Sequence, residues 1–255
     1  MKRSRVVWAV VIGLRLAFAA ALVFGQAPPV SKAPNAVKVP KVKVPNFVDP
    51  TLFDLTALLP PPPAQDGPVT KAELAEIHQI EATRTPAEVA AAQYDDQHEE
   101  MFLYATVIGP SFTEQGFPIT AAFSAHVRSD AGLVDSPLKA HYGRPRPYNF
   151  DKTLHPVCET NTAGSYPSGH SMNGFVFGFV LAQMVPEKKA EILARANEYA
   201  HHRMICEAHY ASDIEASRAE AGFVVGAMMA NARFQKEMAA AKAEIRGKMG
   251  LPVAP

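Results

Sequence analysis

An almost unbroken apolar segment, residues 172–184, constrains the fold of this chain more than any other feature. A helix that is apolar nearly all round must be covered by other elements, so this segment belongs in the middle of a bundle. At about 20 Å of helix it is too short to cross a bilayer. No segment alternates convincingly between apolar and polar residues as a strand would. The sequence therefore predicts an all-α fold, a helical bundle around a buried apolar helix.

Helix start signals define the expected neighbours of this central segment. Thr70 with Glu73, and Thr85-Pro86 with Glu88, predict capping boxes, the second with proline at the first helical position. Ser212-Asp213 is expected to cap the last helix, which continues into a long amphipathic tail. The helices predicted in this way cover residues 71–83, 86–108, 119–128, 172–184, 187–207 and 213–248.

The turn before the apolar helix, Gly164 to Ser171, is the first candidate for a functional site. Ser168 is a natural N-cap, and Gly169 allows a ligand to approach the backbone closely. Free N–H groups and the helix dipole at such a start attract anions. His170 adds a side chain that can donate a proton near neutral pH. The turn predicts phosphate chemistry, although an ordinary capped helix with a chance histidine would have the same local sequence.

The N-terminal quarter of the chain differs in composition from the rest. Residues 1–25, a basic start followed by an apolar stretch, predict a signal peptide cleaved after Gly25 or Ala27. An uncleaved membrane anchor is the alternative, and Arg15 within the apolar stretch counts against it. Residues 26–68 hold 11 of the 22 prolines and predict a tether to residue 48 and an extended arm over 49–68. Residues 69–255 form the predicted helical domain. Five leucine and phenylalanine side chains are expected to anchor the arm: Leu52, Phe53, Leu55, Leu58 and Leu59.

Charge and cysteine content limit the partners and the compartment. The formal net charge is zero, from 25 basic and 25 acidic residues, which argues against nucleic-acid binding. Cys158 and Cys206 both lie beyond the predicted signal peptide. In an oxidising compartment they permit one disulfide. By restricting the unfolded chain, such a bridge would stabilise the fold by about 4 kcal/mol. Two separate buried thiols remain the alternative.

Two further segments carry residues suited to a phosphoryl group. Lys139 is followed after six residues by Arg146-Pro147, and Arg203 is followed after five residues by His209 and after three more by Asp213. Arginine forks and a mobile lysine supply charged donors to phosphate oxygens. Phosphoryl transfer to water also needs a nucleophile and a proton donor, and two histidines can divide these tasks.

The three segments together resemble the signature of the acid phosphatase and vanadium haloperoxidase superfamily, which includes the type 2 phosphatidic acid phosphatases. That signature has the order K-x6-R-P, P-S-G-H and S-R-x5-H-x3-D. The resemblance is closest to the class A bacterial non-specific acid phosphatases, whose versions of the second and third segments are similar to those here. It extends from about Phe53 to Phe234.

The resemblance implies a role for each matching residue. His209 is expected to attack phosphorus, His170 to protonate the leaving alcohol and later activate water, and Asp213 to orient His209. No metal ion and no cofactor is implied, since cationic side chains would stabilise the charge. The residues expected to bind phosphate are Lys139, Arg146, Ser168, Gly169 and Arg203.

One position departs from the signature. The serine before the third-segment arginine is His202 here, which leaves the pocket size, the pH profile and the substrate range open. Arg144 is expected on the surface rather than as another phosphate ligand. A zinc site using His201 or His202 with His209 lacks a third ligand at a suitable spacing. Three tyrosines near the site are expected either to line the pocket or to pack in the core: Tyr148, Tyr166 and Tyr210.

The resemblance therefore predicts a periplasmic or secreted acid phosphatase that hydrolyses small phosphate monoesters through a phosphohistidine and is inhibited by vanadate. The alternatives are a vanadate-dependent haloperoxidase, a lipid phosphate phosphatase and a phosphate-binding protein that has lost its activity. No nucleic-acid partner and no stable membrane insertion of the mature domain are expected. The helical tail 227–248 suggests a homodimer.

Overall fold

The computed structural model describes residues 44–252. The predicted signal peptide over residues 1–25 and the tether up to residue 43 lie outside this part of the chain. Every regular element within residues 44–252 is a helix, as the sequence predicts. The α-helices are α1 (Pro68–Thr83), α2 (Pro86–Asp96), α3 (Ala105–Ile108), α4 (Pro118–Tyr142), α5 (Pro147–Phe150), α6 (Gly169–Met184), α7 (Lys189–Ile205), α8 (Ala211–Met229) and α9 (Ala232–Lys248), with 3-10 turns at Pro50–Leu52, Leu55–Ala57, Met101–Tyr104 and Pro186–Lys188.

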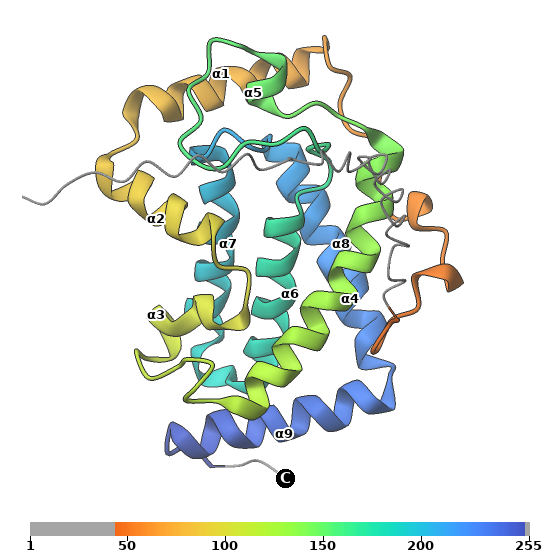
Figure 1. Ribbon diagram of the computed structural model, residues 1–255, viewed down its shortest axis with the longest axis vertical. Helices are drawn as coiled ribbons and strands as arrows, with labels where there is room; N and C mark the ends of the chain where they lie inside the picture. The colour runs from red at the N-terminus through yellow and green to blue at the C-terminus, as the bar shows by residue number, and fades with distance from the viewer. Residues whose placement is uncertain (1–43, 253–255) are drawn as a thin grey trace, which may run out of the picture. The chain divides into compact units, whose positions relative to one another are not determined.

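Helix α6 is the central element, as the apolar segment predicts. It packs against α7, α8, α4 and α9. Figure 1 shows α6 between α7 and α8, with α4 crossing beside them and α9 running across their ends. Twelve of its sixteen residues are buried, which requires neighbours on all sides.

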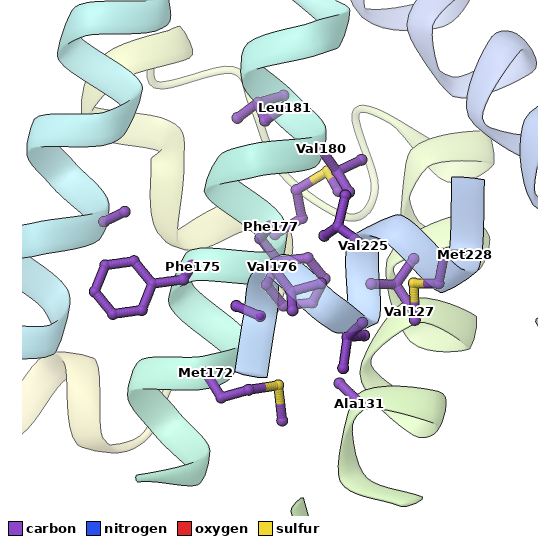
Figure 2. Close-up of a cluster of buried hydrophobic side chains, with 14 of the residues drawn as sticks. Val127, Ala131, Met172, Phe175, Val176, Phe177, Val180, Leu181, Val225 and Met228 are labelled. Atoms are coloured by element: carbon purple, nitrogen blue, oxygen red, sulfur yellow. The ribbon is translucent and has the colours of Figure 1, made fainter. Parts of the chain in front are cut away.

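The core around α6 is almost wholly apolar. Figure 2 shows Phe177, Val180 and Val225 among side chains that meet between α6, α8 and α4. Two glycines of α6 allow tyrosines to pack directly on its backbone. A Cβ atom at Gly174 would lie 2.6 Å from the Tyr199 ring, and one at Gly178 would lie 2.7 Å from the Tyr104 hydroxyl.

Helix α4 is much longer than the predicted 119–128. Beyond residue 128 it continues a stripe of fully buried residues, spaced three and four apart, that faces α6 and α9. Its last turn carries Lys139, so the extension places the first signature segment at the same end of the bundle as the start of α6. The buried stripe consists of Val127, Ala131, Val134 and Leu138.

The prediction of one helix over 86–108 is wrong. The observed helix α2 ends at Asp96, and a 3-10 turn and the short helix α3 follow it. Tertiary hydrogen bonds replace helical ones across this break. The Tyr199 hydroxyl donates to the His98 carbonyl at 2.8 Å, and the Met101 N–H donates to Ser124 Oγ at 3.0 Å. The predicted final helix is also interrupted, at Ala230 and Asn231. The Asn231 side chain caps α9 by accepting from the backbone N–H groups of its first turn.

The three predicted helix starts have different outcomes. The capping box of Thr85 and Glu88 is confirmed. The box of Thr70 and Glu73 is wrong, because α1 begins earlier, with Gly67 as its N-cap, and the Glu73 carboxylate binds the Arg144 guanidinium instead. The cap of α8 is Tyr210, whose N–H donates to Asp213 Oδ2 at 2.9 Å, so the predicted Ser212-Asp213 cap is displaced.

The N-terminal arm is hydrogen-bonded to α4 from Asn46 onward, so the predicted tether ends earlier than residue 48. The buried Asp130 carboxylate accepts hydrogen bonds from the N–H groups of Asn46, Phe47 and Val48 at 2.5 to 3.0 Å. Leu59 is buried, whereas Leu52 is 74% exposed and is no anchor. Leu55 and Leu58 are half-buried and pack on the core, whereas Phe53 is exposed and its ring contacts Phe223.

Candidate active site

The turn before α6 is built as a helix cap. Ser168 is the N-cap, and its Oγ accepts from the Ser171 N–H at 3.4 Å and contacts Ser171 Oγ at 2.9 Å. Its own N–H donates to Ser217 Oγ on α8 at 2.7 Å. The N–H groups of Gly169 and His170, the first two residues of α6, have no carbonyl partner within the helix. This end of α6 therefore offers donors to an anion.

A cavity of about 540 Å³ opens at this end of the bundle. All three signature segments contribute to its wall. Five of the eight predicted site residues line it: Lys139, Arg146, Gly169, His170 and His209. The sequence did not single out the rest of its lining, which includes Glu99, Arg128, Asp135 and Asn173. These residues lie outside the signature segments.

The His209 imidazole is fixed by partners on both nitrogens. Its Nδ1–H donates to the Ser165 carbonyl at 2.8 Å, and its Nε2 accepts from Arg146 Nη1 at 3.0 Å. Burial lowers the pKa of His209 well below its usual value, and the positive charges of Arg146 and Lys139 lower it further. The ring is therefore neutral at neutral pH, with the lone pair on Nε2.

The His170 imidazole lies in the same cavity. Its Nε2–H donates to the Asp96 carbonyl at 3.1 Å, and Nε2 lies 3.6 Å from Glu99 Oε1. Burial, together with the charge of Arg203, lowers the pKa of His170 to about 4. Glu99 is held in turn by the Arg128 guanidinium at 3.1 Å and by Asn173 Nδ2 at 2.8 Å.

Two cationic side chains line the cavity as predicted. Lys139 Nζ donates to the Pro167 carbonyl and lies 3.5 Å from Asp135 Oδ1. Arg146 Nε donates to the Ala163 carbonyl at 3.1 Å, and its Nη1 reaches His209. Burial lowers the pKa of Lys139.

Two predicted phosphate ligands, Ser168 and Arg203, are not part of the wall of this cavity. The Ser168 hydroxyl is engaged in the cap of α6, as given above. The Arg203 guanidinium lies 2.5 Å from Asp96 Oδ1, and the same Asp96 binds His170 through its carbonyl. Arg203 therefore acts on the site in this structure through its charge and through Asp96.

Asp213 does not make the closest contact to His209. Its Oδ2 lies 3.5 Å from His209 Nδ1, farther than the Ser165 carbonyl. Burial raises the pKa of Asp213, and the adjacent Arg144 opposes this effect. Asp213 Oδ1 lies 2.7 Å from Arg144 Nη1. The carboxylate is thus held mainly by Arg144 and by the N–H of Tyr210.

Arg144 is the functional residue that the sequence analysis placed wrongly. It is 3% exposed, and besides Asp213 it binds Glu73 Oε2 at 2.9 Å and covers the Tyr210 ring at 3.8 Å. Its position between Gly143 and Pro145 gave no signal of this role, because the partners come from α1 and α8. The three tyrosines near the site are all buried, and none of them lines the cavity: Tyr148, Tyr166 and Tyr210.

His202, which replaces the expected serine, does not line the cavity. Its Nδ1 lies 2.6 Å from Asp95 Oδ2, and Asp95 is also bound by Arg195 at 2.5 Å. His202 therefore belongs to a buried network between α2 and α7 and is not part of the cavity wall.

Cys158 and Cys206 form a disulfide, which settles the alternative that the sequence left open. The bridge ties the loop before the central turn to the end of α7. Among residues 44–252, the two sulfurs and Asp96 are the one group of possible ligand atoms close enough together to hold a metal ion. Because the sulfurs are joined in the disulfide, neither is a thiolate that could bind a metal. Within the same residues, no helix combines the length and the apolar character needed to cross a membrane.

Comparison with known proteins identifies the class to which this fold and site belong. Residues 120–237 match the model of the PAP2 superfamily. The crystal structure of a bacterial vanadium-dependent iodoperoxidase has the same fold, with a TM-score of 0.53 and 20% identity over 70% of this chain and 54% of that one.

The chain is 31% identical over 208 residues to a non-specific acid phosphatase of Providencia stuartii, covering 75% of this chain and 81% of the relative. A non-specific acid phosphatase of Salmonella typhimurium is 29% identical over 76% of this chain and 80% of the relative. The chain belongs to the PAP2 superfamily and, within it, to the family of bacterial non-specific acid phosphatases. It is a phosphatase by this membership.

Proposed function

We propose that this protein hydrolyses small phosphate monoesters through a phosphohistidine on His209. The observation that carries the proposal is the pair of neutral imidazoles, His209 and His170, that line one cavity together with Lys139 and Arg146. The names of the relatives, non-specific acid phosphatases, support the same reaction class.

The first step forms a bond between His209 Nε2 and phosphorus and breaks the bond from phosphorus to the ester oxygen. Nε2 is the suitable nucleophile because Nδ1 carries the proton that binds the Ser165 carbonyl. The imidazole becomes positively charged, and Asp213 at 3.5 Å stabilises that charge. Arg146 turns from Nε2 to the phosphate oxygens as the substrate enters.

His170 is proposed as the proton donor to the leaving alcohol. In the second step it takes a proton from water, which attacks the phosphohistidine and releases phosphate. A dianionic substrate raises the pKa of this imidazole from about 4, so protonated His170 is most available in acid. An acidic working range follows from that requirement.

The phosphate oxygens are proposed to bind Lys139, Arg146, the N–H of Gly169 and, after rearrangement, Arg203 and the Ser168 hydroxyl. These cations neutralise the charge of the transferring group, and the reaction as proposed needs no metal ion. Chelation by EDTA should leave activity intact, and vanadate should inhibit. We also propose export by cleavage of residues 1–25, and a homodimer, which sedimentation of the mature chain would test.

Replacing His209 by Ala tests the proposal. We expect turnover of p-nitrophenyl phosphate to fall by more than about a thousandfold, and the phosphohistidine trapped by rapid denaturation to disappear. His201→Ala is the matched control, because His201 is exposed on the same helix as Arg203. Turnover of His209→Ala close to wild type would refute the mechanism. Halide oxidation with peroxide and vanadate, if it exceeded phosphatase activity, would favour a haloperoxidase instead.

A further inference from the structure

Two buried carboxyl groups surround Lys139, and the mechanism above uses neither. Asp135 lies one turn before Lys139 on α4, with Oδ1 at 3.5 Å from Lys139 Nζ and without a hydrogen-bond partner. Glu220 on α8 is 0% exposed, and neither of its oxygens has a partner. A buried carboxyl without partners is costly, so this arrangement calls for a physical explanation.

One ammonium group cannot balance two carboxylates. Burial and the nearby charge of Asp135 raise the pKa of Glu220 well above its usual value, so Glu220 keeps its proton at neutral pH. Asp135 then carries the single negative charge that faces Lys139. Burial raises the pKa of Asp135 as well, and Lys139 opposes this. Charged groups act on the Asp135 and Lys139 pair from several segments: Arg146 before α5, Glu99 before the Met101–Tyr104 turn, and Asp213 and Glu220 on α8. Two titratable side chains face the pair across the same cavity, His170 on α6 and His209 before α8.

We propose that Asp135 is a positioning residue that holds the Lys139 ammonium group and takes up one proton from solvent when an oxyanion dianion binds there, while Glu220 stays protonated. The change at Asp135 is from carboxylate to carboxylic acid, and no other covalent bond forms or breaks. This inference rests on the proposed phosphate site and adds a proton-linked regulation of that site.

The position of Asp135 against the start of α6 carries the argument. A Cβ atom at Gly169 would lie 2.8 Å from Asp135 Oδ2, so the carboxylate packs against the helix start that would receive the anion. Asp135 and a bound dianion would then compete for one lysine. Like charges at such a distance favour protonation of one of them, by tenfold or more. Anion binding should therefore strengthen with acidity even where the imidazoles do not change charge.

Titration calorimetry with sulfate tests the inference. Sulfate remains a dianion between about pH 5 and pH 8, so any proton taken up on binding belongs to the protein. Titrations in two buffers of different ionisation enthalpy count these protons. We expect the wild-type protein to take up close to one proton more per sulfate than Asp135→Asn. We also expect Asp135→Asn to bind sulfate about tenfold more tightly at neutral pH.

Matched variants separate this effect from a general change of charge or stability. Glu99→Gln removes a negative charge from the same cavity without touching Lys139, and we expect it to keep the extra proton. Glu220→Gln should keep it too, because Glu220 is already neutral. Asp135→Ser, a smaller side chain beside Gly169, is the second variant should Asp135→Asn fail to fold.

Equal proton counts for the wild type and the Asp135 variants would overturn the inference. Loss of the extra proton in Glu220→Gln, or in Glu99→Gln, would also overturn it, by assigning the proton to another group. These outcomes do not depend on turnover. Failure of the proposed reaction would appear instead as unchanged activity of His209→Ala, and absence of any sulfate binding would refute the anion site itself.

Discussion

Arg144 Nη1 lies 2.7 Å from Asp213 Oδ1, with both side chains at most 2% exposed. This pair joins the first signature segment to the first turn of α8, and His209 lies two residues before that helix begins. Arg144 also binds Glu73 on α1. One buried cation thus fixes three segments of the chain around His209.

Arg144→Met should lower the free energy of unfolding by about 3 to 5 kcal/mol, because it leaves the Asp213 and Glu73 carboxylates buried without their partner. Urea denaturation measures this. Arg218→Met is the control: its ion pair with Glu215 is 38% and 67% exposed, and its loss should cost less than about 1 kcal/mol. Similar costs for the two variants would contradict the role given to Arg144.

His170 should make stability depend on pH. Its pKa is about 4 in the folded chain and near 6.5 when unfolded, so the unfolded chain binds more protons between these values. The free energy of unfolding should therefore fall as the pH falls through this window, by about 2 to 3 kcal/mol from this group. Urea denaturation at about pH 7 and pH 4 measures the difference, which His170→Asn should reduce and the exposed His201→Asn should not. An identical pH dependence in all three proteins would refute it.

Removal of the Cys158–Cys206 bridge should destabilise the protein. The bridge spans 48 residues. Chain entropy alone gives a loss of about 4 kcal/mol for the Cys158→Ser/Cys206→Ala variant. Denaturation with and without a reductant checks this, since the reductant should shift the wild type and leave the variant unchanged. A wild type that does not respond to reduction would show that the bridge contributes nothing.

Gly169→Ala should impair activity through Asp135. The new methyl group would lie 2.8 Å from Asp135 Oδ2 and 3.6 Å from Lys139 Cε, and would displace these two side chains at the proposed anion site. We expect kcat/KM to fall about ten- to a hundredfold. Asp135→Ser should partly restore it by removing the clash. Gly222→Ala on α8 is the control, because a Cβ there meets no atom within 4 Å and should leave kcat/KM unchanged. No rescue by Asp135→Ser would place the damage elsewhere.

The sequence predicted the elements that depend on local pattern. The buried α6, the N-cap at Ser168 and the capping box at Thr85 follow from periodicity and from neighbouring residues, and all three are confirmed. The signature spacing also predicted that Lys139, Arg146, His170 and His209 would meet at one site, and the cavity lining agrees.

Predictions failed where distant segments decide the local structure. The helix over 86–108 ends at Asp96 because Tyr199 and Ser124 bind the backbone after it, and neither residue is near in sequence. Arg144 is buried because Glu73 and Asp213 reach it from two other helices.

The amino-acid sequence by itself determined the all-helical class and the central helix, because these depend on the period of apolar side chains. Most of the groups at the site were expected from the resemblance to the superfamily signature. Only the tertiary structure decided which partner the charged groups far apart in the chain have: Asp96 for Arg203, and Arg144 for Asp213. The physical reason is that charge pairing falls off with distance in space and burial removes the solvent that would weaken it, and neither quantity can be obtained from positions along the chain.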